Sequence, residues 1–254
     1  MDRSLNNHTP DLSKAESALQ DRILAGHSAV LSQVEYFRAN FGLAESKWKK
    51  DGTRVTEVDE NISRELFIPL QKAFPDDDFF SEESAETPDA TPLRAEFCWL
   101  LDPVDGTNNY AVGVTECGIS LGLLHHGTPI YGFIYDYSRD KLLQGGPLFG
   151  SIEGTQPVRA ATELVNEKLT FCMHFPIPSA DLDVLRPKLN EWRIRCPGSA
   201  AMGMANVATG RLDGCLEFRP KPWDCAAGYP ICEGAGATFG FVREACFPMT
   251  SFSP

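Results

Sequence analysis

The chain has 254 residues, of which 43% are hydrophobic and 23% are charged, and its formal net charge is −12. This composition supports a folded core rather than intrinsic disorder, and the length fits one large domain or two modest ones. The acidic balance repels nucleic-acid backbones and anionic membranes, so neither is expected as a partner.

Targeting features and cysteine usage favour a cytoplasmic location. No run approaches the roughly 18 apolar residues of a membrane-spanning helix, and the first residues lack the apolar core of a signal peptide. The eight cysteines include no C-x-x-C pair. Several lie in apolar runs, so we interpret them as buried hydrophobic residues in a reducing compartment.

Apolar residues at helical spacing predict two helices in the first part of the chain. The first follows a capping-box pattern at Ser13 and Glu16 and should stop near Gly42. The second should open at Thr56, and Pro69 is expected to kink it or end it early.

Short apolar runs then predict the strands of a sheet. The run at residues 97–101 is continuous, which is typical of a strand buried on both faces. Further strands are expected at residues 79–81, 118–124, 130–135 and 141–144. The glycine-rich segment 145–156 is the best candidate for a seam between two domains, residues 1–150 and 151–254.

The second half alternates strand and helix patterns, which favours an α+β or layered α/β fold. Strands are expected at residues 169–173, 193–196, 212–217 and 238–242. Helices are expected at residues 179–191, 199–209 and 224–234.

The strongest chemical signal is the string D-P-V-D-G-T-N-N-Y, residues 102–110, which follows the predicted buried strand. Asp102 and Asp105 leave the strand three residues apart, and the proline between them restricts the backbone so that both carboxylates can converge. Gly106 lets backbone come close to a ligand, and Thr107 can cap a short helix. The N–H groups at such a helix start would attract a phosphate.

Four further strings place polar residues at the ends of predicted elements. W-D-C-A-A-G sets Asp224 at a helix start with a face of small residues. Glu82 lies in S-E-E-S after a strand, Asp59 lies in T-E-V-D, and Ser199 lies in G-S-A-A. Alone, each is most simply a helix cap or a solvated group. Their occurrence together with the first string favours a functional reading.

These five strings, in this order, resemble the inositol monophosphatase family from about residue 45 to residue 248. The D-P-x-D-G-T-x-N-aromatic and W-D-x-A-A-G strings, found together, are highly specific for it. The resemblance implies alternating helix and sheet layers of the inositol monophosphatase and fructose-1,6-bisphosphatase type. It also implies a lithium-sensitive homodimer that hydrolyses a small phosphorylated substrate, foremost inositol monophosphate, by in-line attack of a metal-activated water.

The resemblance implies a role for each matching residue. Two or three Mg²⁺ ions would be bound by four carboxylates and one backbone carbonyl, those of Glu82, Asp102, Asp105, Asp224 and Val104. The attacking water would be positioned and deprotonated by Thr107 and Asp59 beside Glu82. The substrate would be contacted by Gly106, Thr107, Gly198, Ser199, Ala200 and Glu217.

The chemistry of the ligand set agrees with magnesium. Carboxylates without a histidine or cysteine ligand favour magnesium over zinc. Two carboxylates about 5 Å apart repel each other by roughly 3 kcal/mol at an effective dielectric constant near 20. Such a cluster is hard to keep ionised without cations, and cations would also offset the repulsion between an acidic protein and a phosphate ester.

Several alternatives stay open at this point. On the same fold, the substrate could be histidinol phosphate, fructose bisphosphate or a nucleotide 3′-phosphate. Asn109 leans toward the monophosphatase branch, whereas Glu217 would suit either a polyol hydroxyl or the amine of histidinol phosphate. A non-catalytic regulator is a reading from another class, and it is disfavoured because no ligand position is lost.

Three further features of the sequence bear on function and extent. The acidic loop lacks the ligand spacing of an EF-hand, so a calcium-binding structural module is not expected. His125 and His126 lie beside Gly127 in a predicted hairpin turn, and no metal role is expected there. The family pattern continues into another strand and helix after Met249, so either the chain is truncated or these elements are missing.

Overall fold

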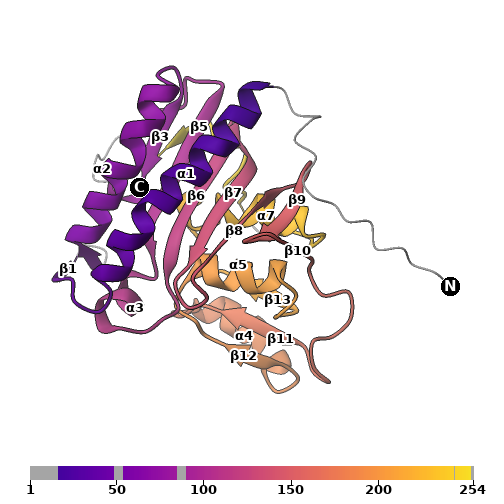
Figure 1. Ribbon diagram of the computed structural model, residues 1–254. Coiled ribbons are helices and arrows are strands. Elements are labelled where there is room, and N and C mark those ends of the chain that lie inside the picture. Colours follow the sequence, from indigo (N-terminus) through magenta and orange to yellow (C-terminus); the bar gives the residue numbers. More distant parts are fainter. Residues whose placement is uncertain (1–16, 49–53, 85–89, 243, 253–254) are drawn as a thin grey trace.

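The computed structural model describes residues 17–48, 54–84, 90–242 and 244–252 (Figure 1). The helices are α1 (Ser17–Ala39), α2 (Glu57–Ala73), α3 (Thr107–Val112), α4 (Ser179–Leu189), α5 (Ala200–Ala208), α6 (Pro222–Cys225) and α7 (Gly228–Gly234). A 3-10 turn, η2, spans Glu82–Ser84. None of the described helices combines the length and the apolar character that crossing a membrane requires.

A seven-stranded sheet forms the centre of the molecule. Its strands are β3 (Asp78–Ser81), β5 (Phe97–Asp105), β6 (Gly118–His125), β7 (Thr128–Asp136), β8 (Lys141–Gly146), β9 (Gly150–Glu153) and β10 (Gln156–Val158). Their order is β10-β9-β8-β7-β6-β5-β3, and only β3 runs parallel to its neighbour β5. The sheet is therefore an antiparallel meander with one parallel strand at its edge.

Three smaller sheets complete the fold. β11 (Thr170–Met173), β12 (Arg193–Arg195) and β13 (Gly214–Leu216) form a parallel sheet in the order β12-β11-β13. β1 (Ser46–Trp48) pairs with β2 (Arg54–Thr56), and β4 (Thr91–Pro92) pairs with β14 (Ser251–Phe252).

Helices cover both faces of the large sheet, which confirms the predicted α+β layering. α1 and α2 lie side by side over one face, while α5 and α7 lie against the other, with the small parallel sheet and α4 beyond α5 (Figure 1). Alternate residues of β5 enter the two cores: Trp99 and Leu101 pack under α1 and α2, and Cys98 and Leu100 face α5 to α7. β5 is thus buried on both faces, as its continuous apolar run predicts.

The chain from α6 to α7 packs directly onto two glycines of the sheet. The predicted helix 224–234 is divided into α6 and α7, and Ala226 and Ala227 lie between them. Gly122 and Gly132 are paired across β6 and β7, and a Cβ at Gly132 would lie 2.1 Å from the Ala227 carbonyl oxygen. Small residues on both sides therefore allow the backbone to touch the sheet.

Other differences from the predictions have local causes. α2 continues past Pro69 to Ala73, because Pro69 lies on the exposed side, where water can solvate the carbonyl that its missing N–H leaves free. Residues 238–242 form no strand. Their aromatic residues pack against other aromatic side chains instead: the Phe239 ring stacks on that of Tyr229 in α7, with ring centroids 4.5 Å apart. The proposed cap at Ser13 and Glu16 falls outside the described residues.

The residues proposed as the domain seam, 145–156, lie within β8, β9 and β10 of the large sheet rather than in a linker. Their glycines support close strand packing: a Cβ at Gly145 would lie 2.3 Å from the Ser151 hydroxyl. The division into two domains, residues 1–150 and 151–254, stays a prediction.

Replacing Gly132 with alanine should destabilise the protein, because the new Cβ would meet backbone atoms of Ala227 that cannot rotate away. We expect the free energy of unfolding to fall by about 1–3 kcal/mol, measured by urea denaturation. Gly240→Ala is the matched control, since nothing lies within 4 Å of its new Cβ, and it should change stability by less than about 0.5 kcal/mol. Equal losses in both variants would contradict the close-packing interpretation.

Candidate functional site

Two of the predicted metal-ligand carboxylates lie at the end of β5. The pairing of β5 with β6 is regular up to Asp102 and resumes only at Asp105, so Pro103 and Val104 form an irregularity between the two acids. Both aspartates are 4% exposed. One Asp102 oxygen accepts a 3.1 Å hydrogen bond from the Val104 N–H, which fixes the orientation of that carboxylate.

Glu82 reaches the same place from the neighbouring parallel strand. Ser81, the last residue of β3, pairs with Leu101 of β5. The next residue in each chain segment is therefore Glu82 on one side and Asp102 on the other, at the same level of the sheet. Glu82 opens the 3-10 turn that follows β3 and is half-buried.

Asp59 faces Thr107 from the first turn of α2. The Asp59 Oδ2 atom accepts hydrogen bonds from the N–H and the hydroxyl of Thr56, which forms a capping box at the predicted start of the helix. Its Oδ1 atom lies 3.3 Å from the Thr107 hydroxyl, which is also 2.9 Å from the Val104 carbonyl oxygen. The single Thr107 proton can thus be donated to either of two oxygens that were both predicted as site atoms.

Asp105 is held by the start of α5. Its Oδ2 atom accepts a 2.7 Å hydrogen bond from the Ala201 N–H, one of the groups that a helix leaves free at its N-terminus. Ser199 is the N-cap of α5, and its hydroxyl accepts a hydrogen bond from the Met202 N–H. The predicted substrate contacts Gly198, Ser199 and Ala200 therefore lie next to Asp105.

Asn109, part of the first sequence string, connects that string to the start of α5. Its amide nitrogen donates to the Pro197 carbonyl at 2.6 Å and to the Glu116 carbonyl at 2.7 Å. Gly198 follows in the left-handed region with φ +73°, and a Cβ there would approach the Asn109 amide to 3.1 Å. The asparagine therefore holds segments 107–112 and 197–200 together.

Asp224 enters the site from α6, whose packing on β5 and β6 brings it to the same end of the sheet. Its Oδ2 atom accepts a 2.7 Å hydrogen bond from the Lys221 N–H, within the first turn of the helix. The side chain is half-buried. The small residues of the W-D-C-A-A-G string thus bring an acid, at a helix start, close to the sheet.

The pKa values report how strongly these acids affect one another. Burial raises the pKa of Asp102 well above its ordinary value, and the charges of Glu82, Asp105 and Asp224 raise it further. Burial likewise raises the pKa of Asp224 to about 8 and that of Asp59 to about 7. For Asp105, burial is partly offset by hydrogen bonds from Ser199 and Ala201, and the pKa is about 6.

This arrangement fits hard divalent cations. Among the described residues, no lysine or arginine forms an ion pair with Asp102, Asp105 or Asp224. These three and Glu82 offer only oxygen donors, the type that Mg²⁺ prefers. They are not among the described groups in which three ligand atoms all lie within 4.8 Å, so the cluster is wider than the shell of one ion.

Glu217 lies close enough to the metal-ligand candidates for its charge to raise the pKa values of Asp105 and Asp224, and it belongs to a hydrogen-bonded group that the sequence did not reveal. It follows β13, and its Oε2 atom is 2.5 Å from His174 Nδ1, while the Cys215 thiol donates to its Oε1 atom at 3.1 Å. Burial lowers the pKa of His174, but the hydrogen bond and the charge of Glu217 outweigh it and raise the pKa to about 9. His174 is therefore a cation at neutral pH.

His174 escaped the sequence analysis because its partner is 43 residues away. Met173, the last residue of β11, pairs with Leu216 of β13, so the next residues, His174 and Glu217, emerge side by side. Only the parallel pairing of these two strands could have indicated the contact.

Comparisons with known proteins identify one family. Residues 21–245 match the model of the inositol monophosphatase family. The chain is 31% identical to a fructose-1,6-bisphosphatase/inositol-1-monophosphatase of Aquifex aeolicus, over 85% of this chain and 84% of that protein. It is 30% identical to a histidinol-phosphatase of Chlorobaculum parvum, over 74% of this chain and 72% of that protein. The structure of a Thermotoga maritima inositol monophosphatase matches with a TM-score of 0.75 and 25% identity, covering 85% of this chain and 84% of that one.

Without divalent ions, the stability of the protein should fall as the pH rises from about 4 to about 8. Asp105, Asp59 and Asp224 have folded-state pKa values of about 6, 7 and 8, whereas an unfolded aspartate titrates near 3.9. The folded protein therefore binds more protons than the unfolded chain in this range, and each added pH unit favours unfolding. Urea denaturation with a chelator present measures the trend.

Asp224→Asn should flatten the upper part of this decline, because it removes the acid with the highest of these three pKa values. Asp183→Asn, an exposed aspartate of α4, is the matched control and should leave the profile unchanged. Adding Mg²⁺ at pH 8 should restore stability to the unsubstituted protein. A stability that rose from pH 4 to pH 8 under chelation would contradict the interpretation.

Proposed function

The chain belongs to the inositol monophosphatase family, and from this premise we propose that it hydrolyses the phosphate monoester of a small polyol, foremost inositol monophosphate. The observation that carries the proposal is the convergence of acids from separate segments. The buried Asp102 carboxyl of β5 lies within the fields of three other acids: Asp105 at the end of the same strand, Glu82 at the start of η2 and Asp224 in α6.

The same observation supports magnesium as the cofactor, with two or three ions in the site. The proposed ligands are the side chains of Glu82, Asp102, Asp105 and Asp224 and the carbonyl of Val104. When bound, Mg²⁺ would lower the pKa of a coordinated water, neutralise the phosphate and stabilise the departing alkoxide.

Thr107 and Asp59 are proposed to prepare the attacking water. As the Thr107 hydroxyl accepts a proton from water, its own proton passes to Asp59 Oδ1, 3.3 Å away. With a pKa of about 7, Asp59 is suited to accept that proton near neutral pH. The contacts from Thr56 to the other Asp59 oxygen keep the carboxylate oriented toward Thr107. The water oxygen then bonds to phosphorus as the ester oxygen leaves, without a phosphorylated enzyme.

The substrate is proposed to lie between two helix starts. Gly106 and Thr107 at α3, and Gly198, Ser199 and Ala200 at α5, would contact the phosphate and the adjoining alcohol. Glu217 would accept a hydrogen bond from a substrate hydroxyl. Since both Glu217 oxygens already receive a donor from His174 or Cys215, the carboxylate is fixed in one orientation for that contact.

The His174–Glu217 pair favours a polyol over histidinol phosphate. A substrate ammonium gains most from an isolated carboxylate, but Glu217 is already neutralised by the His174 cation. The hydrogen bond from a neutral substrate hydroxyl to Glu217 is not weakened in this way by the pairing with His174. Fructose 1,6-bisphosphate is the second candidate, because a relative whose name includes that activity is 31% identical to this chain. The regulator reading is disfavoured, since all the proposed ligand positions keep suitable oxygen donors.

We also propose a cytoplasmic, lithium-sensitive homodimer. All eight cysteines are free thiols, as expected for a reducing compartment. Dimerisation and lithium inhibition follow from family membership, and light scattering and a lithium titration of activity would test them.

Phosphate release from a substrate panel tests the proposed function. We expect inositol 1-phosphate to be cleaved faster than fructose 1,6-bisphosphate, histidinol phosphate and adenosine 3′,5′-bisphosphate, and only with Mg²⁺. Asp105→Asn and Asp224→Asn should each lower kcat by on the order of 100-fold or more, while Asp183→Asn should not. Unchanged activity in either site variant would remove its assigned role, and inactivity on every substrate would favour the regulator reading.

A second experiment tests the selectivity of the His174–Glu217 pair. His174→Gln keeps a hydrogen-bonding group beside Glu217 but removes the cation, so histidinol phosphate should gain relative to inositol 1-phosphate. We expect the ratio of the two kcat/KM values to shift by about tenfold, which corresponds to about 1.4 kcal/mol. His27→Gln, a histidine on α1 bonded to Gln144, is the control. An unchanged ratio would show that His174 does not influence which of the two substrates is preferred.

A further inference from the structure

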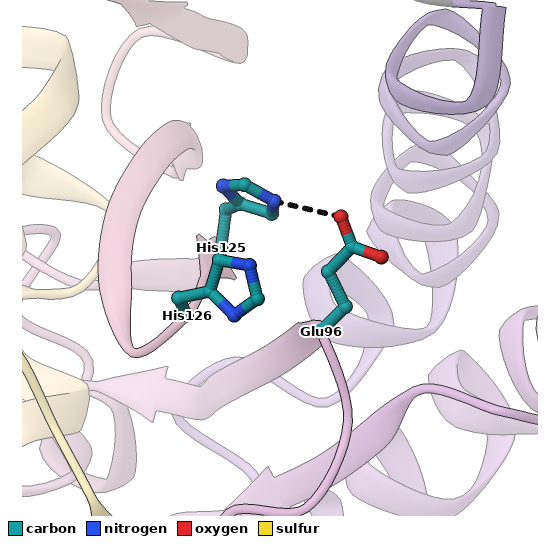
Figure 2. A group of neighbouring side chains, drawn as sticks. All are labelled: Glu96, His125 and His126. Carbon is teal, nitrogen blue, oxygen red and sulfur yellow. Dashed lines mark hydrogen bonds and ion pairs between the residues drawn. The ribbon is translucent and has the colours of Figure 1, made fainter.

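A second group of metal-ligand side chains lies at the other end of β5 and β6. Glu96 precedes β5, His125 ends β6, and His126 begins the turn to β7. Figure 2 shows the Glu96 carboxylate beside the His125 ring, with the His126 ring adjacent. One ligand atom from each residue lies within 4.8 Å of the other two.

Backbone pairing brings these residues together. His125 is opposite Phe97 in the antiparallel register of β5 and β6, so Glu96 extends one residue beyond that pair. The His126 N–H donates a 2.8 Å hydrogen bond to the Glu96 carbonyl. The His125 Nε2 atom is 2.9 Å from Glu96 Oε1, and the two imidazole rings are 4.3 Å apart. The group is therefore ordered by the sheet as well as by contacts between side chains.

The turn that carries His126 is itself fixed by the end of the chain. Gly127 accepts a 2.8 Å hydrogen bond from the Met249 N–H, and a Cβ on Gly127 would lie 1.9 Å from the Met249 carbonyl oxygen. His126 adopts φ +48°, a left-handed conformation that is uncommon for a residue with a side chain. Packing against Met249 thus holds His126 in a conformation that directs its ring toward His125.

Charge and exposure both suit an ion that binds from solvent. The pKa of Glu96 is lowered chiefly by its hydrogen bond to His125 and further by the charge of Arg22, so its carboxylate is ionised at neutral pH. The side chains of His125 and Glu96 are 39% and 61% exposed. Solvent can therefore complete the coordination of an ion bound by the three residues.

The group is separate from the acidic cluster. Asp102 lies six residues further along β5 than Glu96, and a strand rises about 3.3 Å per residue, which gives roughly 20 Å between them. The donor atoms differ as well, since two imidazoles and one carboxylate are typical of zinc sites, whereas Mg²⁺ prefers oxygen donors.

From this arrangement we propose that Glu96, His125 and His126 form a binding site for a divalent transition metal ion, with Zn²⁺ as the best fit. The bound ion would link the start of β5 to the turn between β6 and β7. This reverses the expectation from the sequence, where the two histidines had no visible third ligand. Glu96 is 29 residues from His125, and only the pairing of β5 with β6 brings it within reach. The proposal does not depend on the proposed phosphatase activity.

Zinc titration of the full chain in excess Mg²⁺ tests the proposal. Calorimetry gives affinity and stoichiometry, and NMR of the imidazole nitrogens shows which histidines bind. We expect one equivalent of Zn²⁺ to shift the ring signals of His125 and His126 but not those of His27. His126→Gln should weaken binding by roughly 100-fold or more, since loss even of a residue that supports a ligand costs about 10- to 100-fold. The same variant should lose any rise in thermal stability caused by zinc.

Controls separate this site from other zinc ligands. Cys196→Ser removes an exposed thiol and should leave the affinity unchanged, and so should His27→Gln. Glu96→Gln is a second site variant at an exposed position, so it tests the proposal even if His126→Gln misfolds. Each of three results would overturn the proposal. The first is that the ring signals of His125 and His126 do not shift, and the second is that both site variants keep full affinity. The third is a dissociation constant near 1 mM for Zn²⁺, which corresponds to a binding free energy of only about 4 kcal/mol in magnitude.

Discussion

The repulsion among buried carboxylates at one end of β5 is the constraint that governs the architecture. Three helices begin beside it, and the start of each donates a backbone N–H to one acid: Asp59 accepts from Thr56, the N-cap of α2, Asp105 accepts from the start of α5, and Asp224 accepts in the first turn of α6. Helix starts carry partial positive charge, so this arrangement reduces the electrostatic cost without neutralising the acids. The negative charge that the helix starts do not offset can attract cations. Folding and metal binding are therefore expected to be thermodynamically linked in this protein.

Much of the fold was predictable because its signals are local. The apolar run before Asp102 indicated β5, and Thr56 indicated the start of α2. Contacts between distant segments were not predictable. β4 and β14 are two residues each and pair across most of the chain, and the alternation at Phe239 looked like a strand although the residues pack against a helix. A short alternating run does not reveal whether a partner strand exists.

In the candidate site, too, local sequence signals were predictable and contacts between distant segments were not. Its acids stand in compact strings with specific spacing, so Asp102, Asp105 and Asp224 could be selected from the sequence. His174 and Glu96 stand in no such string. Each meets its partner only through strand pairing, in the small parallel sheet for His174 and in the large sheet for Glu96. The residues proposed to tune selectivity or to bind a transition metal ion therefore could not be identified before the pairing of strands was known.

The glycines of the sheet beneath α6 and α7 determine how deeply an acid reaches into the site. Because Ala226 and Ala227 lie directly on Gly122 and Gly132, the height of Asp224 above the sheet is set by backbone atoms and the Ala226 methyl group. The contact includes no flexible side chain that could rotate to accommodate added volume. A larger residue at either glycine would thus displace the Asp224 carboxyl group, which lies just before the two alanines in the sequence. We expect Gly122 and Gly132, although they contact no ligand, to tolerate substitution as poorly as the acids themselves.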